Sequence, residues 1–199
     1  IYKSIDAGKE IVLDNCYIQD LSLSLYRSQR GIEKKEFVKL NSFSARNSIF
    51  AAHIATDLSY SDFGDCNVSF EGSHFASGKV QLNNIRSGKG GFSLSGTCIK
   101  DGNIELTGSE FGEGDFEFKN SVVGNGVKDF QDMIFSEGDI TFANTEFNSG
   151  DILFINSHFG KGNFSFKIAR IISGKIDFHY ASFGEGDVIF ERTEFGDTR

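Results

Sequence analysis

The chain has 199 residues, of which 28 are acidic and 20 basic, for a formal net charge of −8. This balance leaves no basic footprint for nucleic acid, so direct nucleic-acid binding is not expected. The absence of Pro and Trp beside 22 Phe and 23 Gly fits neither a collagen-like nor a disordered chain, and it leaves every backbone N–H available to a hydrogen-bonded ladder. No stretch approaches the roughly 20 apolar residues of a membrane span.

The first 62 residues are expected to form irregular N-terminal coils or a cap. Seven residues match the inward positions of two short repeat units, Ile11, Leu13, Cys16, Ile18, Leu23, Leu25 and Ser28. The pattern is then lost over residues 30–50, where the charged segment RGIEKKEF indicates an inserted loop or short helix. The sequence therefore divides into an irregular part, 1–62, with an inserted loop at 30–50, and a regular part, 63–199.

From Phe63 onward an apolar residue returns every twelve positions, with Ser87 as the exception. The series runs Phe63, Phe75, Ile99, Phe111, Val123, Phe135, Phe147, Phe159, Ile171, Phe183 and Phe195. The unit reads F-x-x-G-[DNK]-[IVF]-x-[FL]-x-x-[ST]-x. Alternation of apolar and outward residues, as in Ile140-Thr141-Phe142, predicts a short strand with one buried face.

Two such units are expected to form each coil, because one twelve-residue coil has no volume for three large inward side chains. Alternate units also differ in sequence. Their third position is charged in one set, Asp65, Lys89, Glu113, Glu137, Lys161 and Glu185, and mostly small and polar in the other. The predicted fold is therefore an all-β, right-handed parallel β-helix with about 24 residues per coil, the coils stacked roughly 4.8 Å apart.

The repeat resembles the core of the pentapeptide-repeat family. Large inward residues are spaced alternately by five and seven, as in Phe142, Phe147 and Phe154, and a small residue stands two before the leading Phe, as at Thr145 and Ser157. The resemblance covers 63–199 well and 11–28 weakly, and it implies a four-sided right-handed β-helix without enzymatic activity. This chain departs from the family by two extra residues at the Gly-Asp bend. Some members are acidic rods that look like DNA to a topoisomerase, but none of their functional residues can be matched here.

An acidic edge is the most suggestive surface feature. With 24-residue coils, seven carboxylates fall along one edge: Asp65, Glu113, Asp115, Glu137, Asp139, Glu185 and Asp187. This edge is either a phosphate-mimicking or cation-binding ridge, or the product of Gly-Asp bend chemistry and of charges that keep a rod soluble. Lys89 and Lys161 interrupt the series and favour the second interpretation.

No catalytic site, metal site or cofactor is expected. The four histidines, His53, His74, His158 and His179, fall at different places in the repeat, so they predict neither a triad nor a metal cluster. The three cysteines lack zinc spacing, and reduced thiols favour a cytoplasmic location.

Two interior positions yield specific expectations. Phe142 and Phe166 occupy the same inward position one coil apart and should stack. Lys128 stands where other units bury Ile or Val. We expect either a bulge that turns Lys128 outward and Val127 or Met133 inward, or a lysine that extends to solvent.

The pattern as a whole favours a non-catalytic protein-binding or scaffolding module, part of a larger protein or of an oligomer. The alternatives are an acidic nucleic-acid mimic that acts on a DNA-handling enzyme such as a topoisomerase, and a carbohydrate-active β-helix enzyme with paired carboxylates.

The last complete unit, with Phe183, Val188 and Phe190, is followed by no cap of its own. We expect this end to be covered by a second copy in a homodimer or by continuing chain.

Overall fold

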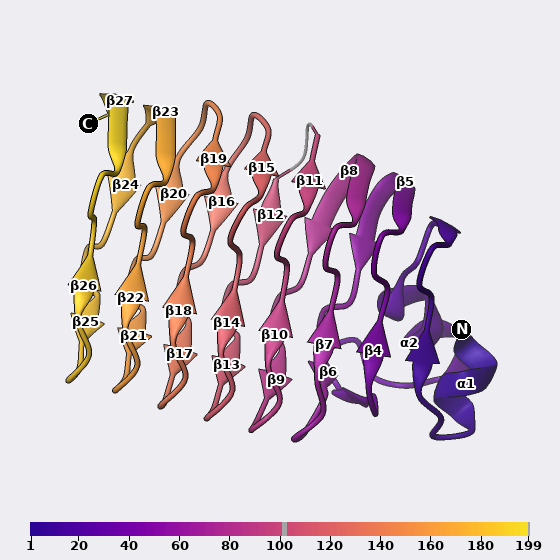
Figure 1. Cartoon of the computed structure of the whole chain (residues 1–199). Coiled ribbons are helices and arrows are strands. Elements are labelled where there is room, and N and C mark those ends of the chain that lie inside the picture. Colours follow the sequence, from indigo (N-terminus) through magenta and orange to yellow (C-terminus); the bar gives the residue numbers. More distant parts are fainter. Residues whose placement is uncertain (101–102, 199) are drawn as a thin grey trace.

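The computed structural model describes residues 1–100 and 103–198; Gly102, one glycine of the repeat series, lies outside the described residues. Parallel coils stack along one axis into a β-solenoid, with two helices at its N-terminal end (Figure 1). Successive coils pair residues that are 24 apart, as Phe92 pairs with Phe116 and Phe116 with Ile140. The predicted coil length and the parallel all-β architecture are confirmed.

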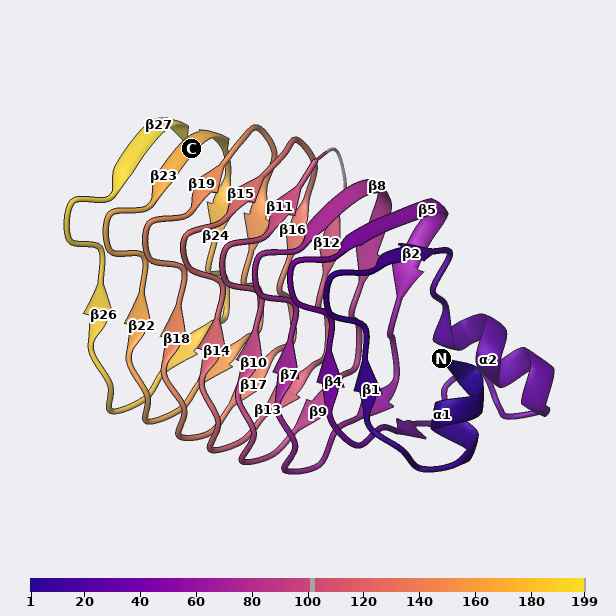
Figure 2. The same ribbon diagram turned by 45° about the vertical axis from the view of Figure 1, so that its right-hand side comes forward.

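Three sheets run the length of the rod, and each coil contributes short strands to all of them (Figure 2). The eight-stranded sheet has the order β1 (Ile11–Val12), β4 (Phe43–Ser44), β7 (Val68–Ser69), β10 (Phe92–Ser93), β14 (Phe116–Glu117), β18 (Ile140–Thr141), β22 (Phe164–Ser165), β26 (Val188–Ile189). The seven-stranded sheet joins β3 (Val38–Lys39), β6 (Ser61–Asp62), β9 (Arg86–Ser87), β13 (Glu110–Phe111), β17 (Ile134–Phe135), β21 (His158–Phe159), β25 (Ser182–Phe183).

The twelve-stranded sheet covers the two remaining sides of the coil. Its trunk consists of β2 (Tyr17–Gln19), β5 (Ile49–Asp57) and β8 (His74–Gln81). One arm continues through β11 (Cys98–Ile99), β15 (Val122–Val123), β19 (Glu146–Phe147), β23 (Arg170–Gly174) and β27 (Glu194–Thr198), and the other through β12 (Ile104–Glu105), β16 (Lys128–Asp129), β20 (Ile152–Leu153) and β24 (Ile176–Asp177).

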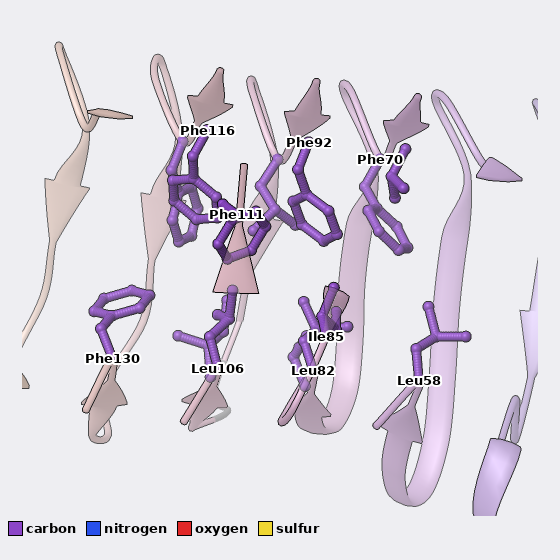
Figure 3. Packing of buried hydrophobic residues seen from close by; sticks show 14 of the residues in the cluster. Leu58, Phe70, Leu82, Ile85, Phe92, Leu106, Phe111, Phe116 and Phe130 are labelled. Carbon is purple, nitrogen blue, oxygen red and sulfur yellow. The ribbon is translucent and has the colours of Figure 1, made fainter. Parts of the chain in front are cut away.

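The core is a set of apolar columns that run parallel to the rod axis. Side chains point inward from the strands and recur from coil to coil (Figure 3). The rings of Phe142 and Phe166 stack with centroids 4.7 Å apart, as expected, and those of Phe130 and Phe154 lie 5.1 Å apart. Such offset aromatic stacks add to the free energy of burial, so the coils are held together by side chains as well as by backbone.

In most units a small polar residue forms hydrogen bonds between the coils at alternate corners. The Ser121 hydroxyl donates to the carbonyl oxygen of Leu94 in the previous coil, at 3.0 Å, and accepts from the backbone N–H of Thr97 at 3.1 Å. Buried polar groups need such partners. These two hydrogen bonds to the neighbouring coil explain why most units carry Ser or Thr two residues before the leading Phe.

Tight corners of the coil adopt the left-handed backbone conformation. Asn120 and Asn144 occupy one corner column at φ 56° and 54°, and the Asn144 side-chain amide donates to the Asn120 oxygen at 3.0 Å. The next coil places Ile168 there at φ 59°. A β-branched residue in this region is strained.

The glycine of the Gly-Asp bend is needed for a different reason. A Cβ on Gly138 would overlap the carbonyl oxygen of Gly114 in the preceding coil. The bends of neighbouring coils therefore approach each other more closely than any side chain permits.

Two helices close the N-terminal end of the rod. Helix α1 spans Tyr2–Asp6 and helix α2 spans Leu23–Arg30, and they bury Ile5, Leu23 and Tyr26. Ser22 caps α2 by accepting from the backbone N–H of Leu25 at 3.1 Å.

This arrangement corrects two expectations for residues 1–62. Leu23, Leu25 and Ser28 lie in α2 and not in a repeat unit, because the Ser22 cap starts a helix there. The expected loop at 30–50 contains β3, β4 and the start of β5. The extra residues lie earlier in the chain, since Ile11 pairs with Phe43, 32 positions on, and α2 lies between them.

Lys128 contradicts both expectations made for it. Strand β16 pairs in register with β12 and β20, so no bulge turns the side chain outward. Lys128 is fully buried, and its ammonium donates to the carbonyl oxygens of Asn148 and Ser149 at 3.1 and 3.0 Å. Backbone carbonyls of the next coil thus take the place of water around the charge.

Shortening the stacked ring of Phe142 should destabilise the rod. Phe142 is buried and packs against rings in the coils before and after it. The substitution Phe142→Ala should lower the free energy of unfolding by about 3 to 5 kcal/mol, because the neighbouring coils cannot close the cavity. Chemical denaturation measures this, and a loss below about 1 kcal/mol would contradict the inward assignment of Phe142.

Relieving the strained corner should stabilise the rod. Ile168→Asn restores the residue type of this corner column, and we expect a gain of about 1 kcal/mol in the free energy of unfolding. The reverse change one coil earlier, Asn144→Ile, is the matched control and should cost a similar amount. Equal stability of both variants and the unchanged protein would show that the corner carries no strain.

The buried lysine should make stability depend on alkaline pH. Burial lowers the pKa of Lys128 to about 8, although Asp151 opposes this shift. Between this value and the ordinary 10.5, the unfolded chain binds more protons than the folded one, so stability should rise with pH across this window. Below about pH 8 both states are protonated at this residue and its contribution is constant.

The substitution Lys128→Met fills the same volume without a titrating group. Urea unfolding of both proteins at several pH values tests the expectation. The unfolding free energy of the unchanged protein should rise relative to that of Lys128→Met as pH rises through the window, and a constant difference would disprove the assignment.

Candidate protein-binding surfaces

The acidic edge exists as two columns at the bends that precede the eight-stranded sheet. One column holds Asp65, Glu113, Glu137 and Glu185 with Lys89 and Lys161 among them. The other holds Asp115, Asp139 and Asp187 with Asn67, Gly91 and Asn163. Hydrogen bonds between residues 24 apart connect members of each column, so the fold brings the predicted residues to one edge.

The aspartates of the second column bond to backbone of the next coil. A carboxylate oxygen of Asp115 accepts from the N–H of Asp139 at 2.9 Å, and one of Asp139 accepts from Asn163 at 2.7 Å. Asn163 in turn accepts from the N–H of Asp187 at 2.9 Å through its side-chain oxygen. Because both Asp and Asn accept this hydrogen bond from the backbone of the next coil, the column requires a hydrogen-bond acceptor and not a negative charge.

The glutamates of the first column are paired with its lysines. Lys89 Nζ lies 3.3 Å from Glu113 Oε1, and Lys161 Nζ lies 2.6 Å from Glu137 Oε1. The hydrogen bond from Lys161 lowers the pKa of Glu137 and raises that of Lys161 itself. Two of the seven carboxylates of this edge are therefore paired with lysines of the rod, which interrupts its likeness to a phosphate backbone at these positions.

The histidines lie apart from one another. His74 is on β8 and His158 on β21, in different sheets, while His53 Nδ1 lies 2.8 Å from a carboxylate oxygen of Asp20. Within residues 1–100 and 103–198, His, Cys, Asp and Glu form no group of three that could hold a metal ion. None of the helices in the described part of the chain is long and apolar enough to cross a membrane.

An apolar stripe on the twelve-stranded sheet is a surface that the sequence analysis missed. Register pairing stacks five outward residues along it, Tyr17, Ile49, His74, Cys98 and Val122. Tyr17, Ile49 and Val122 are all exposed. Counting outward residues at a period of 24 would have revealed the three later members, but the irregular spacing before Phe63 hides the first two.

The C-terminal coil exposes the apolar interior of the rod. Phe183, Val188, Phe190 and Phe195 are 40, 45, 37 and 49% exposed. Their equivalents one coil earlier, Phe159, Phe164, Phe166 and Ile171, are at most 1% exposed. The four strands of this coil, β24 to β27, each stand at the end of their sheet.

The two ends of the rod thus differ. Helices α1 and α2 lie at the N-terminal end of the rod (Figure 2), whereas no helix or strand of residues 1–100 and 103–198 lies beyond β24 to β27 of the last coil. Edge strands that lack a partner are templates for pairing with another chain. We take this open C-terminal coil as the principal candidate binding surface.

No family model and no curated protein sequence matches the chain. Among solved structures the chain is similar to HetL, a pentapeptide repeat protein involved in heterocyst differentiation regulation from the cyanobacterium Nostoc sp. strain PCC 7120. The sequence identity is 9% and the TM-score 0.28, and the alignment covers 99% of this chain and 92% of HetL. We draw neither partner nor activity from a likeness at this level.

Charge at the acidic edge should be dispensable for folding, but the hydrogen-bond acceptor should not. Asp139→Asn should change the free energy of unfolding by less than about 0.5 kcal/mol, and Asp139→Ala should lower it by about 1 kcal/mol, because the N–H of Asn163 then loses its partner. Thermal and urea unfolding of the two variants measure the contrast. If Asp139→Asn were the more harmful change, the charge itself would stabilise the rod.

Proposed function

We propose that the chain is a non-catalytic protein-binding or scaffolding module that docks through its open C-terminal coil. The observation that supports this is the exposure of Phe183, Val188, Phe190 and Phe195 at positions that every earlier coil buries. Contiguous apolar surface of this kind marks an interaction site in a soluble protein.

The partner should extend the stack. Each of the four terminal strands has one free edge, so a strand presented by the partner can add main-chain hydrogen bonds while its apolar side chains cover the exposed rings. We expect the rest of the rod to act as a rigid scaffold, since polar side chains along it bond to the neighbouring coils.

A second copy of the chain is the simplest partner with which to test the surface. Two open ends that meet about a two-fold axis would bury both apolar faces. At about 1 M salt, where charges are screened within roughly 3 Å, light scattering should detect a concentration-dependent dimer.

Phe190→Asp should abolish this dimer by placing a charge in the interface. Ile134→Asp is the matched control, because Ile134 is exposed on the side of the rod and away from the end. A monomer at every concentration and salt, with no binding of an apolar fluorescent dye at the end, would refute the proposal.

The acidic edge supports a second candidate, a nucleic-acid mimic that acts on a DNA-handling enzyme. Asp115→Asn, Asp139→Asn and Asp187→Asn together remove three charges at positions where Asn is native to the same column. If the unchanged protein inhibits a topoisomerase in a supercoiling assay and this variant does not, the mimic is supported. Inhibition by neither protein would exclude that enzyme as its target.

A further inference from the structure

One position in the aspartate column of the acidic edge is occupied by glycine. Elsewhere in this column a side-chain oxygen accepts from the backbone N–H of the residue 24 positions on, as Asn67 accepts from Gly91 at 2.9 Å. Strands β10 and β14 pair in register, so the N–H of Asp115 faces residue 91 of the preceding coil. Gly91 has no side-chain oxygen to offer it. We call this place in the column the Gly91 gap.

The backbone does not require glycine at residue 91. Gly91 does not adopt the left-handed conformation, and a Cβ there would lie 3.7 Å from the carbonyl oxygen of Asp115 and 3.9 Å from Asn67 Oδ1, which are ordinary contact distances. A Cβ on Gly90 or Gly114 would instead overlap the carbonyl group of the preceding coil. The rod therefore forgoes a hydrogen bond at residue 91 that its geometry would permit.

The Gly91 gap opens into a groove on the outer face of the eight-stranded sheet. The groove has a volume of about 490 Å³, and its walls include Asn67, Ser69, Ser93 and Asp115. Each of the two serine hydroxyls accepts from the backbone N–H two residues later at 3.3 Å. A hydroxyl that accepts in this way still has its own proton to donate, so the groove offers two O–H donors beside the gap.

The charge of the groove disfavours an anionic ligand. Lys89 pairs with Glu113 at 3.3 Å, and Lys119 pairs with Glu117. Within the described residues, this leaves Asp115 as the one charged group of the groove outside an ion pair. A carboxylate or phosphate would be repelled by it, so the acceptor that fits the N–H of Asp115 is a neutral oxygen.

A primary carboxamide matches the groups on the two sides of the gap. Its oxygen can accept from the N–H of Asp115 while its NH₂ group donates to Asn67 Oδ1, because the two functions lie on adjacent atoms. The rod already contains such an amide-to-amide contact, since the Asn144 side chain donates to the Asn120 oxygen at 3.0 Å. A hydroxyl or a carboxylate cannot provide this donor and acceptor side by side.

We propose that the Gly91 gap binds the side-chain carboxamide of an asparagine in a peptide segment of a partner protein. The bound asparagine takes the place in the column that Asn67 and Asn163 occupy in other coils. The hydroxyls of Ser69 and Ser93 donate to carbonyl oxygens of the same peptide. This site lies on the side of the rod, and it does not depend on the C-terminal coil to which the proposed function is assigned.

A set of matched small probes tests the chemistry. Acetyl-asparagine methylamide is compared with the aspartate, serine and alanine compounds of the same form, by NMR titration that follows the backbone amide of Asp115. The asparagine probe should bind on the order of tenfold more tightly than the alanine probe, because it forms two additional hydrogen bonds. The amide of Asp151 is the internal reference, since Val127 one coil earlier also lacks a side-chain oxygen. Equal responses at Asp115 and Asp151 would contradict a specific site.

Filling the gap from within the rod tests its position. Gly91→Asn supplies the missing acceptor, so it should raise the midpoint of thermal unfolding by about 2 to 4 °C and abolish binding of the asparagine probe. Val127→Asn is the matched control, because it offers an acceptor to Asp151 outside the groove and should leave binding unchanged. A lower midpoint for Gly91→Asn would show that the column does not accommodate a side chain there and would overturn the inference.

The outcomes are separate from those of the proposed function. Phe190→Asp, which should disrupt docking at the C-terminal coil, should bind the asparagine probe as the unchanged protein does. If the asparagine probe binds no more tightly than the alanine probe, the Gly91 gap is not a carboxamide site, and docking at the C-terminal coil is unaffected. Tightest binding by the aspartate probe would assign the gap to carboxylates and would also refute this inference.

Discussion

Parallel backbone pairing between residues 24 apart is the constraint on which the rest of the structure depends. It places every position of the repeat in a column, so that the neighbours of a side chain are its own equivalents in the coils before and after it. The phenylalanine stacks, the asparagine corners and the aspartate acceptors all follow from this one register. A side chain stabilises this rod when it packs against, or bonds to, an identical or chemically complementary residue at the equivalent position of the neighbouring coil.

Departures from a column are tolerated where the neighbouring coils supply what is missing. Lys128 replaces an apolar residue in the interior, yet the carbonyl oxygens of Asn148 and Ser149 bind its ammonium. Ile168 adopts a left-handed conformation that costs roughly 1–2 kcal/mol, and the corner keeps its shape because coils on both sides impose it. The cost at Ile168 is smaller than the roughly 3 to 5 kcal/mol that one buried ring contributes.

The groups that join one coil to the next, apolar side chains and backbone hydrogen-bonding groups, lack partners in the last described coil. Apolar side chains and strand edges are exposed in the last described coil. Under the proposed function, a partner would cover them as the next coil covers their equivalents elsewhere in the rod. The ion pairs Lys89–Glu113 and Lys161–Glu137 of the acidic edge join one coil to the next within the rod itself.

The architecture of the regular part follows from the amino-acid sequence. A parallel stack converts sequence period directly into spatial neighbours, so the twelve-residue spacing and the charged third position identified the coil length, the inward residues and the membership of the acidic edge. The hydrogen-bond partners of these residues depend on the tertiary structure. The bonds of Asp139 depend on how a bend approaches the next coil, and the partners of Lys128 are backbone atoms without a sequence signature. Helix α2 is held by a residue that is distant in sequence. The carboxylate of Asp57 accepts a hydrogen bond from the backbone N–H of Ser24, 33 positions earlier, at 2.9 Å. Such contacts join segments that do not share the repeat, so the sequence period does not predict them.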